Sequence, residues 1–416
     1  MGGSRYGLLG KTLQHSYSKE IHESMGVYGF SLWEKTPEEL DFFLKAKDFD
    51  GAMVTIPYKE KVLEYVEEMS PEAAALGSAN LLLKNRQGEL QAYNTDLEGF
   101  RYMIQRAGLN LCGKKVLVLG DGATGRTAVH VMRTMGASEI RVASRRGKEG
   151  KQGEVEVVSY NRGWPQADVL INTTPVGMYP QNGEVLVELS RFPFLEAVFD
   201  VIYNPMFTSL LLQARDRGLV TGNGLSMLVA QGVLGAEIFL KGKLPGGKNR
   251  EEWTETILEQ LRERLTNRVL VGMPGSGKTT YGKKMAEVTG KIFVDTDDLV
   301  EQHSGQTISA LFQEGGEPLF RRWEKEVALE IGKRTGQVIA TGGGMVLQRE
   351  AMDALRQNGR ILWVKRPLEE LACEGRPLSK DLPALEEMAR QREPLYKKYA
   401  EEVFLKKSVE REQKDE

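Results

Sequence analysis

Short apolar segments alternate with segments of helical periodicity from the start of the chain. The pattern predicts strands over residues 6–9, 27–33 and 52–56 and helices over residues 19–25 and 37–45. Thr36 and Pro37 suit the N-cap and the first position of the second helix. Alternation of this kind is typical of a parallel or mixed sheet with helices on its faces.

The same alternation continues through the middle of the chain. A helix over residues 98–106 leads to a buried strand over residues 116–119, which is followed at once by glycines. Further strands are predicted over residues 139–143, 155–158, 167–171, 198–201 and 219–221. A long helix over residues 226–240 ends this part of the chain.

A break follows, and another α/β unit begins behind it. Residues 241–250 are rich in Gly, Pro and Lys, as in a linker, and residues 251–265 have the pattern of a polar helix. A strand over residues 268–271 opens the next unit. We therefore expect four parts: residues 1–97 completed by the helix 224–240, residues 98–223, the linker and helix 241–266, and residues 267–416.

Composition narrows the class of protein. The 416 residues carry 56 Lys and Arg against 58 Asp and Glu, a formal net charge of −2, which excludes a general nucleic-acid binder. Only two cysteines occur, Cys112 and Cys373, which excludes a disulfide framework and favours a reducing, cytoplasmic location. No apolar run is long enough for a membrane helix, so we expect no membrane partner.

A phosphate-binding loop is predicted directly behind the strand 268–271. Residues 272–280 fit G-x-x-x-x-G-K-[ST] and precede a helical segment over residues 281–288, the context that this motif requires. Backbone N–H groups of such a loop converge on phosphate oxygens, Lys278 reaches the terminal phosphates and Thr279 can ligate Mg²⁺. The candidate nucleotide contacts are Gly275, Ser276, Gly277, Lys278, Thr279 and Thr280. The loop alone does not distinguish a GTPase, an ATPase and a small-molecule kinase.

Two carboxylates favour phosphoryl transfer to a small acceptor. Asp295 and Asp297 stand at i and i+2 at the end of a predicted strand, so both side chains should lie on one face beside the loop. One carboxylate can serve the metal shell, and the other can orient an attacking hydroxyl. An Asp-rich helix cap explains the pair equally well.

Four further motifs follow the carboxylates. Thr341-Gly342-Gly343-Gly344 comes after a strand over residues 338–340, where we expect backbone close to a ligand. The other three contain arginines and are Phe320-Arg321-Arg322-Trp323-Glu324, Arg376-Pro377-Leu378 and Arg392-Glu393-Pro394-Leu395-Tyr396. Arginines on a helix can clamp an anion or simply be solvated.

In order and spacing, these motifs resemble shikimate kinase over residues 267–405. The resemblance implies that shikimate is held by Asp297, Arg321, Gly343 and Arg392, with Arg392 on its carboxylate. It implies that Lys278 and Arg376 contact the ATP phosphates, and that Thr279 and, through water, Asp295 serve Mg²⁺. A gluconate-kinase-like phosphotransferase is the alternative, because the loop and the D-x-D pair alone do not choose.

A dinucleotide-binding turn is predicted in the middle of the chain. G-x-G-x-x-G stands between the strand 116–119 and a helix over residues 126–135, and its candidate contacts are Gly120, Asp121, Gly122, Ala123 and Thr124. The next strand ends in Ser144-Arg145-Arg146 rather than in Asp or Glu. Two arginines there suit the 2′-phosphate of NADP, unless they only begin a basic loop.

A lysine and an aspartate form a candidate acid–base pair. Lys59 lies beyond Pro57 at the end of the strand 52–56, and Asp96 precedes a helix. Such a pair can deliver a proton to a carbonyl oxygen as hydride reaches the carbon. A solvated lysine and an N-cap aspartate are the alternative. Two hydroxyls, Ser16 and Ser18, follow the first strand.

Residues 6–240 resemble shikimate dehydrogenase. The matching motifs are H-S-x-S from His15, V-T-x-P-x-K from Val54, S-A-N from Ser78, N-T-D from Asn94, N-T-T-P-V-G-M from Asn172, Y-N-P from Tyr203 and G-L-S-M-L-V-A-Q from Gly224. The resemblance implies that the substrate is held by Ser16, Ser18, Thr55, Asn80, Asp96 and Gln231, with Tyr203 near it. It implies an acid–base role for Lys59, paired with Asp96. It also implies NADP contacts for the glycine turn and for Ser144, Arg145 and Arg146, with Val201 and Gly224 near the nicotinamide.

The chain departs from this family at a few positions. The family usually has Asn where Met53 stands, G-A-G-G-A in place of residues 120–124, and Asn-Arg-Thr in place of residues 144–146. Asp121 therefore brings a carboxylate close to the expected pyrophosphate. These departures concern cofactor affinity more than the type of reaction.

Together the observations predict an α/β protein with an N-terminal α/β substrate domain, a Rossmann-type NADP domain and a P-loop kinase domain. The two resemblances imply NADPH-dependent reduction of 3-dehydroshikimate and ATP-dependent phosphorylation of the resulting shikimate, on the route to chorismate and the aromatic amino acids. One half could instead be a catalytically weak or regulatory module, but Lys59, Asp96, Lys278 and Asp297 are all present. A quinate/shikimate dehydrogenase using NAD is the other alternative, and an acid at Ser144 would have favoured it.

Overall fold

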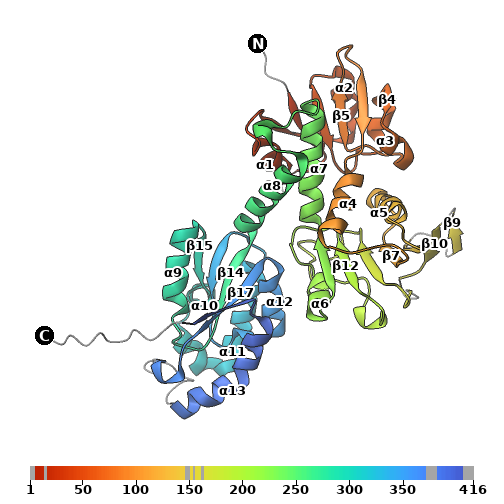
Figure 1. The fold of residues 1–416 in the computed structure, drawn as a ribbon. Helices are drawn as coiled ribbons and strands as arrows, with labels where there is room; N and C mark the ends of the chain where they lie inside the picture. The colour runs from red at the N-terminus through yellow and green to blue at the C-terminus, as the bar shows by residue number, and fades with distance from the viewer. Residues whose placement is uncertain are drawn as a thin grey trace. The chain divides into compact units, whose positions relative to one another are not determined.

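The chain folds into two compact units, Met1–Gln260 and Leu261–Glu416 (Figure 1). The computed structural model describes residues 5–13, 16–145, 150–152, 155–160, 164–371 and 382–405. Within these ranges no helix is both long and apolar enough to cross a bilayer.

The first sheet of the first unit is mixed, as the alternating pattern predicts. Its strands run in the order β2-β1-β3-β5-β6-β4, with antiparallel pairing only of β3 with β5 and of β5 with β6. Their bounds are Tyr6–Gly10 for β1, Phe30–Glu34 for β2, Gly51–Val54 for β3, Glu68–Met69 for β4, Leu81–Lys84 for β5 and Leu90–Tyr93 for β6. The helices of this part are α1 (Ser18–Glu23), α2 (Pro37–Ala46) and α3 (Pro71–Leu76), with a 3₁₀ turn over Lys61–Tyr65.

The predicted start of α2 is confirmed. Thr36 is the N-cap and donates its N–H to Glu39 at 2.9 Å, while Pro37 occupies the first turn. Leu40 and Leu44 of α2 pack with Leu9 and Val54 on one face of the first sheet. The fixed start of this helix therefore sets which of its side chains reach the core.

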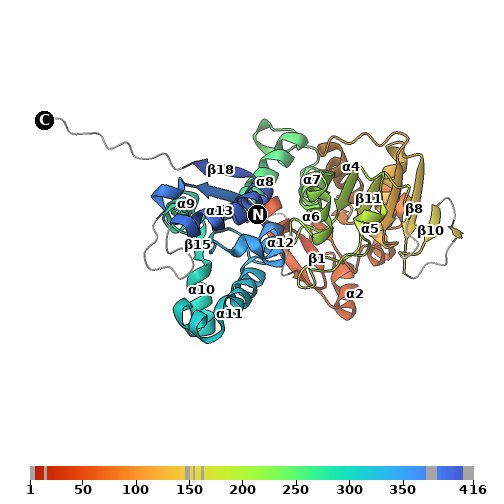
Figure 2. The same cartoon turned by 90° about the horizontal axis from the view of Figure 1, so that it is seen from below.

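The second sheet of the first unit has the order β13-β12-β11-β7-β8-β10-β9 and is parallel except for β9. Its strands are β7 (Lys115–Leu119), β8 (Glu139–Ala143), β9 (Gly150–Gln152), β10 (Val155–Val158), β11 (Val169–Asn172), β12 (Ala197–Asp200) and β13 (Val220–Asn223). Figure 2 shows β11, β8 and β10 following one another towards the edge of this sheet.

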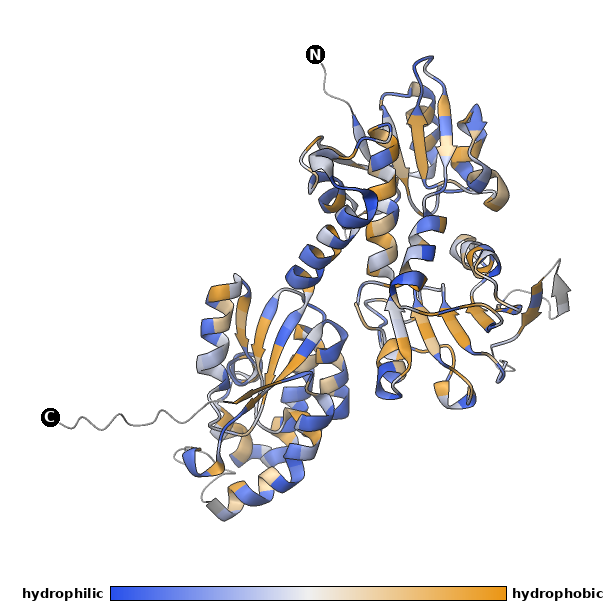
Figure 3. Cartoon of the chain, in the orientation of Figure 1, coloured by the Kyte–Doolittle hydropathy of each residue, from blue (hydrophilic) through white to orange (hydrophobic). Residues whose placement is uncertain are grey.

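Helices cover both faces of the second sheet because its strands are apolar on both sides. Val116 and Val118 face α4 (Asp96–Arg106), α5 (Ala123–Thr134) and the start of α7 (Gly224–Phe239). Leu117 and Leu119 face α6 (Ser209–Asp216). The buried strands accordingly stand out as hydrophobic in Figure 3, whereas the helices show mixed faces.

Helix α8 (Arg250–Leu265) runs from the first unit into the second. Its early part is fixed to the first unit, because Glu255 accepts hydrogen bonds from Tyr102 and Arg106 of α4. Despite its polar composition, the helix buries Ile257, Leu258, Leu261 and Leu265. It is therefore a packed element rather than a free spacer.

The second unit contains one parallel sheet of the order β15-β16-β14-β17-β18. Its strands are β14 (Asn267–Val271), β15 (Ile292–Asp295), β16 (Gln337–Ala340), β17 (Gly359–Lys365) and β18 (Glu402–Leu405). One face packs against α9 (Lys278–Thr289), and the other against α10 (Thr296–Ser304), α11 (Ile308–Ile331), α12 (Arg349–Gln357) and α13 (Leu382–Tyr399).

Candidate active sites

Lys59 and Asp96 meet in the first unit. Lys59 Nζ donates to Asp96 Oδ2 at 2.5 Å, and the two side chains are only 18% and 12% exposed. Lys59 lies behind β3, and Asp96 is the first residue of α4. Neither is a solvated surface charge, and the carboxylate holds the ammonium group in one position.

An amide network extends the pair and defines the Lys59 site, which we take as Lys59, Asn80, Asp96 and Gln231. Asn80 Nδ2 lies 3.0 Å from Asp96 Oδ1 and 3.1 Å from Gln231 Oε1. Gln231 comes from α7, and Asn80 precedes β5. Four residues predicted from separate motifs are thereby brought together.

The predicted hydroxyl residues lie at the start of α1. Ser16 Oγ donates to Ser18 Oγ at 3.0 Å and accepts from the Ser18 N–H at 3.2 Å. Helix α1 packs on α7 so closely that a Cβ on Gly232, next to Gln231, would lie 2.9 Å from Ile21. The serine pair is therefore carried on the helix that lies against α7.

Two more predicted substrate contacts lie at strand ends. Thr55, behind β3, donates its N–H to Leu9 of β1 at 2.9 Å. The ring of Tyr203 lies 5.7 Å from the ring of Tyr17, and burial, together with Tyr17, raises the pKa of Tyr203 to about 12. Tyr203 is thus a neutral hydrogen-bonding group at ordinary pH.

The glycine turn lies where the strand order of the second sheet reverses, between β7 and β11. Ligands of open parallel sheets bind at this switch point. Gly120 has φ of +106°, and a Cβ there would lie 2.8 Å from Thr173 Oγ1 behind β11. Gly122 has no atom within 4 Å of its Cβ position, so the turn leaves room for a ligand above it.

The turn differs from the prediction in one respect. Helix α5 begins at Ala123, not at residue 126, so Ala123 and Thr124 form its first turn, and Gly122 is the N-cap. The three glycines let the helix begin at once, because a Cβ on Gly125 would overlap the carbonyl of Gly120. Ala123 and Thr124 therefore present helix N–H groups, which suit a pyrophosphate.

The other predicted dinucleotide residues fall into two groups. Val201 and Gly224 are in contact, since a Cβ on Gly224 would overlap the Val201 carbonyl. Ser144 is buried behind β8 and donates to Asp121 Oδ2 at 2.6 Å, and Arg145 is exposed. Arg146 lies outside the described residues.

The buried carboxyl of Asp200 is hydrogen-bonded to residues at the end of β11 and behind β12. Asp200 Oδ2 accepts from Thr208 Oγ1 at 2.7 Å, and Asp200 Oδ1 accepts from Asn172 Nδ2 at 3.1 Å. Burial raises the pKa of Asp200 to about 7 despite these hydrogen bonds. Its contacts connect the N-T-T-P-V-G-M segment to the sheet, so its role is structural.

The phosphate-binding loop of the second unit lies at the other switch point, between β14 and β17. Lys278 Nζ donates to the carbonyls of Gly272 and Met273 at 2.9 and 3.0 Å. Gly275 and Gly277 have φ of +82° and +92°, which bends the loop back to the start of α9. Within the described part of the chain, the buried Ser276 Oγ has no hydrogen-bond partner. The loop thus offers a cation, a hydroxyl and helix N–H groups to a phosphate.

The predicted strand geometry of the two carboxylates is wrong. Strand β15 ends at Asp295, and Asp297 lies in the first turn of α10, where its N–H donates to Asp295 Oδ1 at 3.1 Å. The chain begins a helix here instead of continuing the strand because the Asp295 side chain is a strong N-cap. Asp295 also accepts from Thr279 Oγ1 at 2.8 Å, so the hydroxyl and the carboxylate expected to serve Mg²⁺ are neighbours.

Asp297 is nearly enclosed. Its Oδ1 atom is buried and has no hydrogen-bond partner among the described residues. Burial first, and then the charges of Asp295 and Glu324, raise the pKa of Asp297 to about 7, although Lys278 acts in the opposite direction. A carboxyl poised near neutral pH suits a general base.

The glycine triplet behind β16 lies against other residues of this site. A Cβ on Gly342 would overlap Glu324, one on Gly343 would lie 2.8 Å from Pro274, and one on Gly344 would overlap Arg321. Neighbouring groups of the site therefore leave little room for a Cβ at these three positions, and the contact of Gly343 with shikimate stays a prediction.

Arginines close the other side of this site. Arg321 is held by Glu324 at 2.5 Å and by Glu317 at 2.7 Å, and its side chain is only 15% exposed. Arg392 is buried, its Nε has no hydrogen-bond partner in the described structure, and burial lowers the pKa of its guanidinium. Its neighbour Tyr396 donates to the Gly343 carbonyl at 2.6 Å. Arg376 lies outside the described residues.

Two residues of these sites are absent from the predicted set. Thr95 is buried, and its Oγ1 contacts both Asn80 and Gln231 at 2.8 and 3.3 Å. Glu324 is fully buried and positions Arg321. Both residues belong to motifs quoted above: Thr95 stands next to Asp96, and Glu324 stands three residues after Arg321. Their positions within these motifs were the sequence signal that could have identified them.

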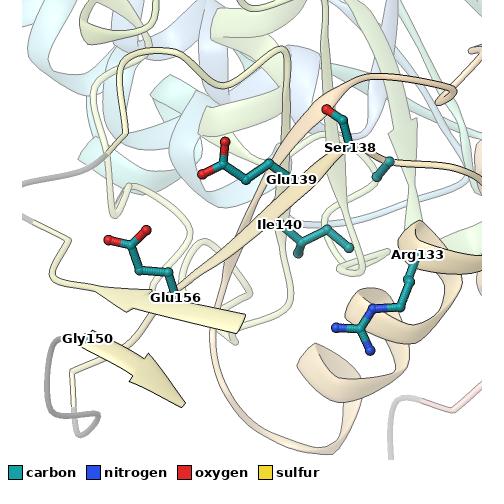
Figure 4. A pocket seen from close by; sticks show the side chains of 7 residues that line it. Arg133, Ser138, Glu139, Ile140, Gly150 and Glu156 are labelled. Carbon is teal, nitrogen blue, oxygen red and sulfur yellow. The ribbon is translucent and has the colours of Figure 1, made fainter. Parts of the chain in front are cut away.

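A pocket of about 480 Å³ lies elsewhere, at the start of β8. It is lined by Arg133, Ala137, Ser138, Glu139, Ile140, Gly150 and Glu156, and Figure 4 shows Glu139 and Glu156 on adjacent strands. Because Glu139 begins β8 and Ser144 follows its end, this pocket is at the opposite edge of the sheet from the glycine turn. It does not belong to either site.

Family models match both units. The model of the shikimate dehydrogenase substrate binding domain matches residues 8–82, and the shikimate kinase model matches residues 274–415. The shikimate dehydrogenase (NADP(+)) of Clostridium perfringens is 36% identical over 274 residues, which are 62% of this chain and 99% of that protein.

Solved structures resemble the first unit. A chorismate mutase/shikimate 5-dehydrogenase fusion protein from Clostridium acetobutylicum is 34% identical, with a TM-score of 0.58 over 63% of this chain and 98% of its own. A quinate dehydrogenase from Corynebacterium glutamicum, solved with NAD, is 26% identical, with a TM-score of 0.55 over 62% of this chain and 99% of its own.

Proposed function

The chain belongs to the shikimate dehydrogenase family and carries a shikimate kinase domain, and on that premise we propose that it catalyses two consecutive reactions. The first unit reduces 3-dehydroshikimate to shikimate with NADPH. The second phosphorylates the 3-hydroxyl of shikimate with ATP. The observation that carries the proposal is that one chain holds two sites, one built on the Lys59–Asp96 pair and one on the phosphate-binding loop with Asp297.

In the reductase unit, Lys59 acts as the proton donor. Bound NADPH supplies the hydride that forms the new C–H bond at the carbonyl carbon. Lys59 Nζ gives a proton to the carbonyl oxygen, which becomes the alcohol, and Asp96 stabilises the ammonium form and orients it. Asn80, Gln231 and the serine pair on α1 hold the other oxygens of the substrate.

In the kinase unit, Asp297 accepts the proton of the attacking 3-hydroxyl. That oxygen forms a bond to the γ-phosphorus of ATP, and the bond from phosphorus to the β,γ-bridging oxygen breaks to leave ADP. Lys278 and the loop N–H groups stabilise the charge on the transferred phosphoryl group. Arg321 and Arg392 hold the carboxylate and hydroxyls of the acceptor, and Arg376 acts on the phosphates.

Mg²⁺ belongs to the same proposal. The Thr279 hydroxyl and the Asp295 carboxylate are neighbouring oxygen donors, and Mg²⁺ is usually bound by one or two such groups together with water and substrate phosphates. When bound, the ion would neutralise charge on the phosphates. We also infer that the protein acts in the cytoplasm on small molecules alone.

We extend the proposal to the division of the chain. Residues 1–97 with the helix 224–240 bind the substrate of the reductase, residues 98–223 bind NADPH, and residues 267–416 form the kinase. Residues 241–266 join the parts, and the contacts of Glu255 with α4 support a structural role for their helix in the reductase.

The purified full chain tests the proposal directly. NADPH oxidation should require 3-dehydroshikimate, and mass spectrometry should identify shikimate without ATP and shikimate 3-phosphate with Mg-ATP. NADPH oxidation without any phosphorylated product would contradict the kinase assignment. Phosphorylation of supplied shikimate without NADPH oxidation would contradict the reductase assignment.

A further inference from the structure

Asp121 and Ser144 form a hydrogen bond that the sequence patterns do not predict. Asp121 lies in the glycine turn behind β7, and Ser144 follows β8, 23 residues later. Leu119 and Ala143, which end the two strands, are register partners. The two loops therefore start side by side, and Ser144 Oγ donates to Asp121 Oδ2 at 2.6 Å.

This contact places an acid where the adenosine ribose of a dinucleotide is read. In such folds an Asp or Glu at the end of the second strand binds the 2′-hydroxyl of NAD, and arginines at the same place bind the 2′-phosphate of NADP. The residue at that position in the chain is Ser144, which is not acidic. In the folded chain, however, the hydroxyl of Ser144 is hydrogen-bonded to the carboxylate of Asp121, so an acidic group lies beside this position.

A cationic group shares the same place. Arg145 follows Ser144 and is exposed, and Tyr160 lies behind β10, the neighbour of β8. The pKa of Tyr160 is raised mainly by burial, while the charge of Arg145 lowers it and that of Asp121 raises it. The charges of Arg145 and Asp121 thus both act on the Tyr160 phenol. The region therefore carries a cation that suits the 2′-phosphate of NADP and a carboxylate that suits the 2′-hydroxyl of NAD.

We propose that Asp121 is a specificity-determining residue for the dinucleotide, and that it makes the reductase accept NADH as well as NADPH. Ser144 fixes the carboxylate beside the ribose, where it accepts from a 2′-hydroxyl and repels a 2′-phosphate. Arg145 opposes this preference by attracting the 2′-phosphate. The inference rests on the proposed reductase function.

The test compares kcat/KM for NADPH with kcat/KM for NADH in the full chain, with 3-dehydroshikimate as substrate. Asp121→Asn keeps the shape and can still accept from Ser144, but it removes the charge. We expect it to raise the NADPH-to-NADH ratio by about tenfold or more, the usual effect of a hydrogen bond to a charged group. Asp121→Ala should move the ratio in the same direction, and Arg145→Ala should lower it.

Glu139→Gln is the matched control. It removes one partly exposed carboxylate from β8, the strand that Ser144 follows, at the end of this strand remote from Ser144 (Figure 4). Its ratio should equal that of the unaltered chain. Because the kinase belongs to the other unit, the circular dichroism spectrum and the thermal midpoint of each variant report whether its reductase unit is folded.

Two results would overturn the proposal: an unchanged ratio in both Asp121 variants, or a ratio that moves towards NADH. Direct titration of both dinucleotides, followed by their own fluorescence, separates this outcome from a failure of the reductase assignment. If the chain binds the dinucleotides but never reduces 3-dehydroshikimate, the titrations of Asp121→Asn still decide the role of Asp121.

Discussion

At the scale of single residues, Asp297 lies among other negative charges in a buried position, where little water can stabilise its own charge. Asp295, Glu324 and Asp298 all raise its pKa, and burial raises it most. The folded protein therefore disfavours the ionised form. Below a pH of about 7 the carboxyl is mostly protonated and cannot accept a proton from the substrate.

The kinase should accordingly show a rising pH profile. We expect kcat/KM for shikimate to increase as pH rises through about 7 and then to level off, because the free enzyme must ionise Asp297. Asp297→Asn should lower turnover by about a hundredfold or more. Asp298→Asn, an exposed neighbour on the same helix, is the control: its turnover above pH 7 should stay near normal, and its profile should shift slightly to lower pH because Asp298 raises the pKa of Asp297. A flat profile, or an active Asp297→Asn variant, would contradict the role of this carboxylate.

The same pKa has a consequence for stability. The folded pKa of about 7 lies above the ordinary value of 3.8, so ionisation costs folding free energy, and stability is lost as pH rises from about 4 to 7. Asp297→Asn removes this loss, and its thermal midpoint should depend less on pH over this range. Carboxylates are often kept at such cost where chemistry needs them.

Sequence patterns predicted many residues of the two sites, but they did not predict all the contacts that these residues make. Lys59, Asp96, Asn80 and Gln231 were predicted as one site, and the structure brings them together. The contact of Asp121 with Ser144 was not predictable, because it depends on how two strands pair. The close approach of Glu324, Pro274 and Arg321 to the glycines at 342–344 was not predictable either, because it depends on how distant segments pack.

At the scale of elements, the bounds of several strands and helices were predicted closely. The strands Glu139–Ala143 and Val155–Val158 have the predicted bounds, and α2, α7 and α8 begin within two residues of theirs. Errors occurred where a cap residue decides the start of a helix. Asp295 starts α10 and Gly122 starts α5 earlier than apolar periodicity indicates.

Helix α8 allows a test at this scale. Glu255 accepts from Arg106 at 2.8 and 3.1 Å and also from Tyr102. Because the pair is about one third exposed, Glu255→Ala should cost the reductase unit about 1 kcal/mol, with the discount that solvent screening requires. That corresponds to a fall of roughly 0.3–1 M in the urea midpoint of reductase activity.

Glu259→Ala, an exposed glutamate on the same helix, is the matched control. Its urea midpoint should not move, and the difference between the two variants should shrink in high salt. Equal midpoints for both variants at low salt would mean that α8 contributes nothing to the reductase through Glu255.

At the scale of the whole molecule, the two units have separate sheets and separate hydrophobic cores. Lesions in one unit should therefore spare the other. Lys59→Ala should lower the reductase rate by about a hundredfold or more and leave phosphorylation of supplied shikimate near normal. Lys61→Ala, which removes an exposed lysine paired with Glu64, is the control for the reductase. Loss of both activities in a folded Lys59→Ala protein would contradict two independent units.

The position of Glu255 also bears on the order in which the chain is made. Both reductase sheets, α7 and the anchored part of α8 precede residue 261, so they leave the ribosome before any strand of the kinase sheet. At 5–20 residues per second, synthesis of residues 261–416 takes roughly 8–30 s. The reductase unit can thus complete its own hydrogen bonds, including that of Glu255 with Arg106, while the kinase is still being translated.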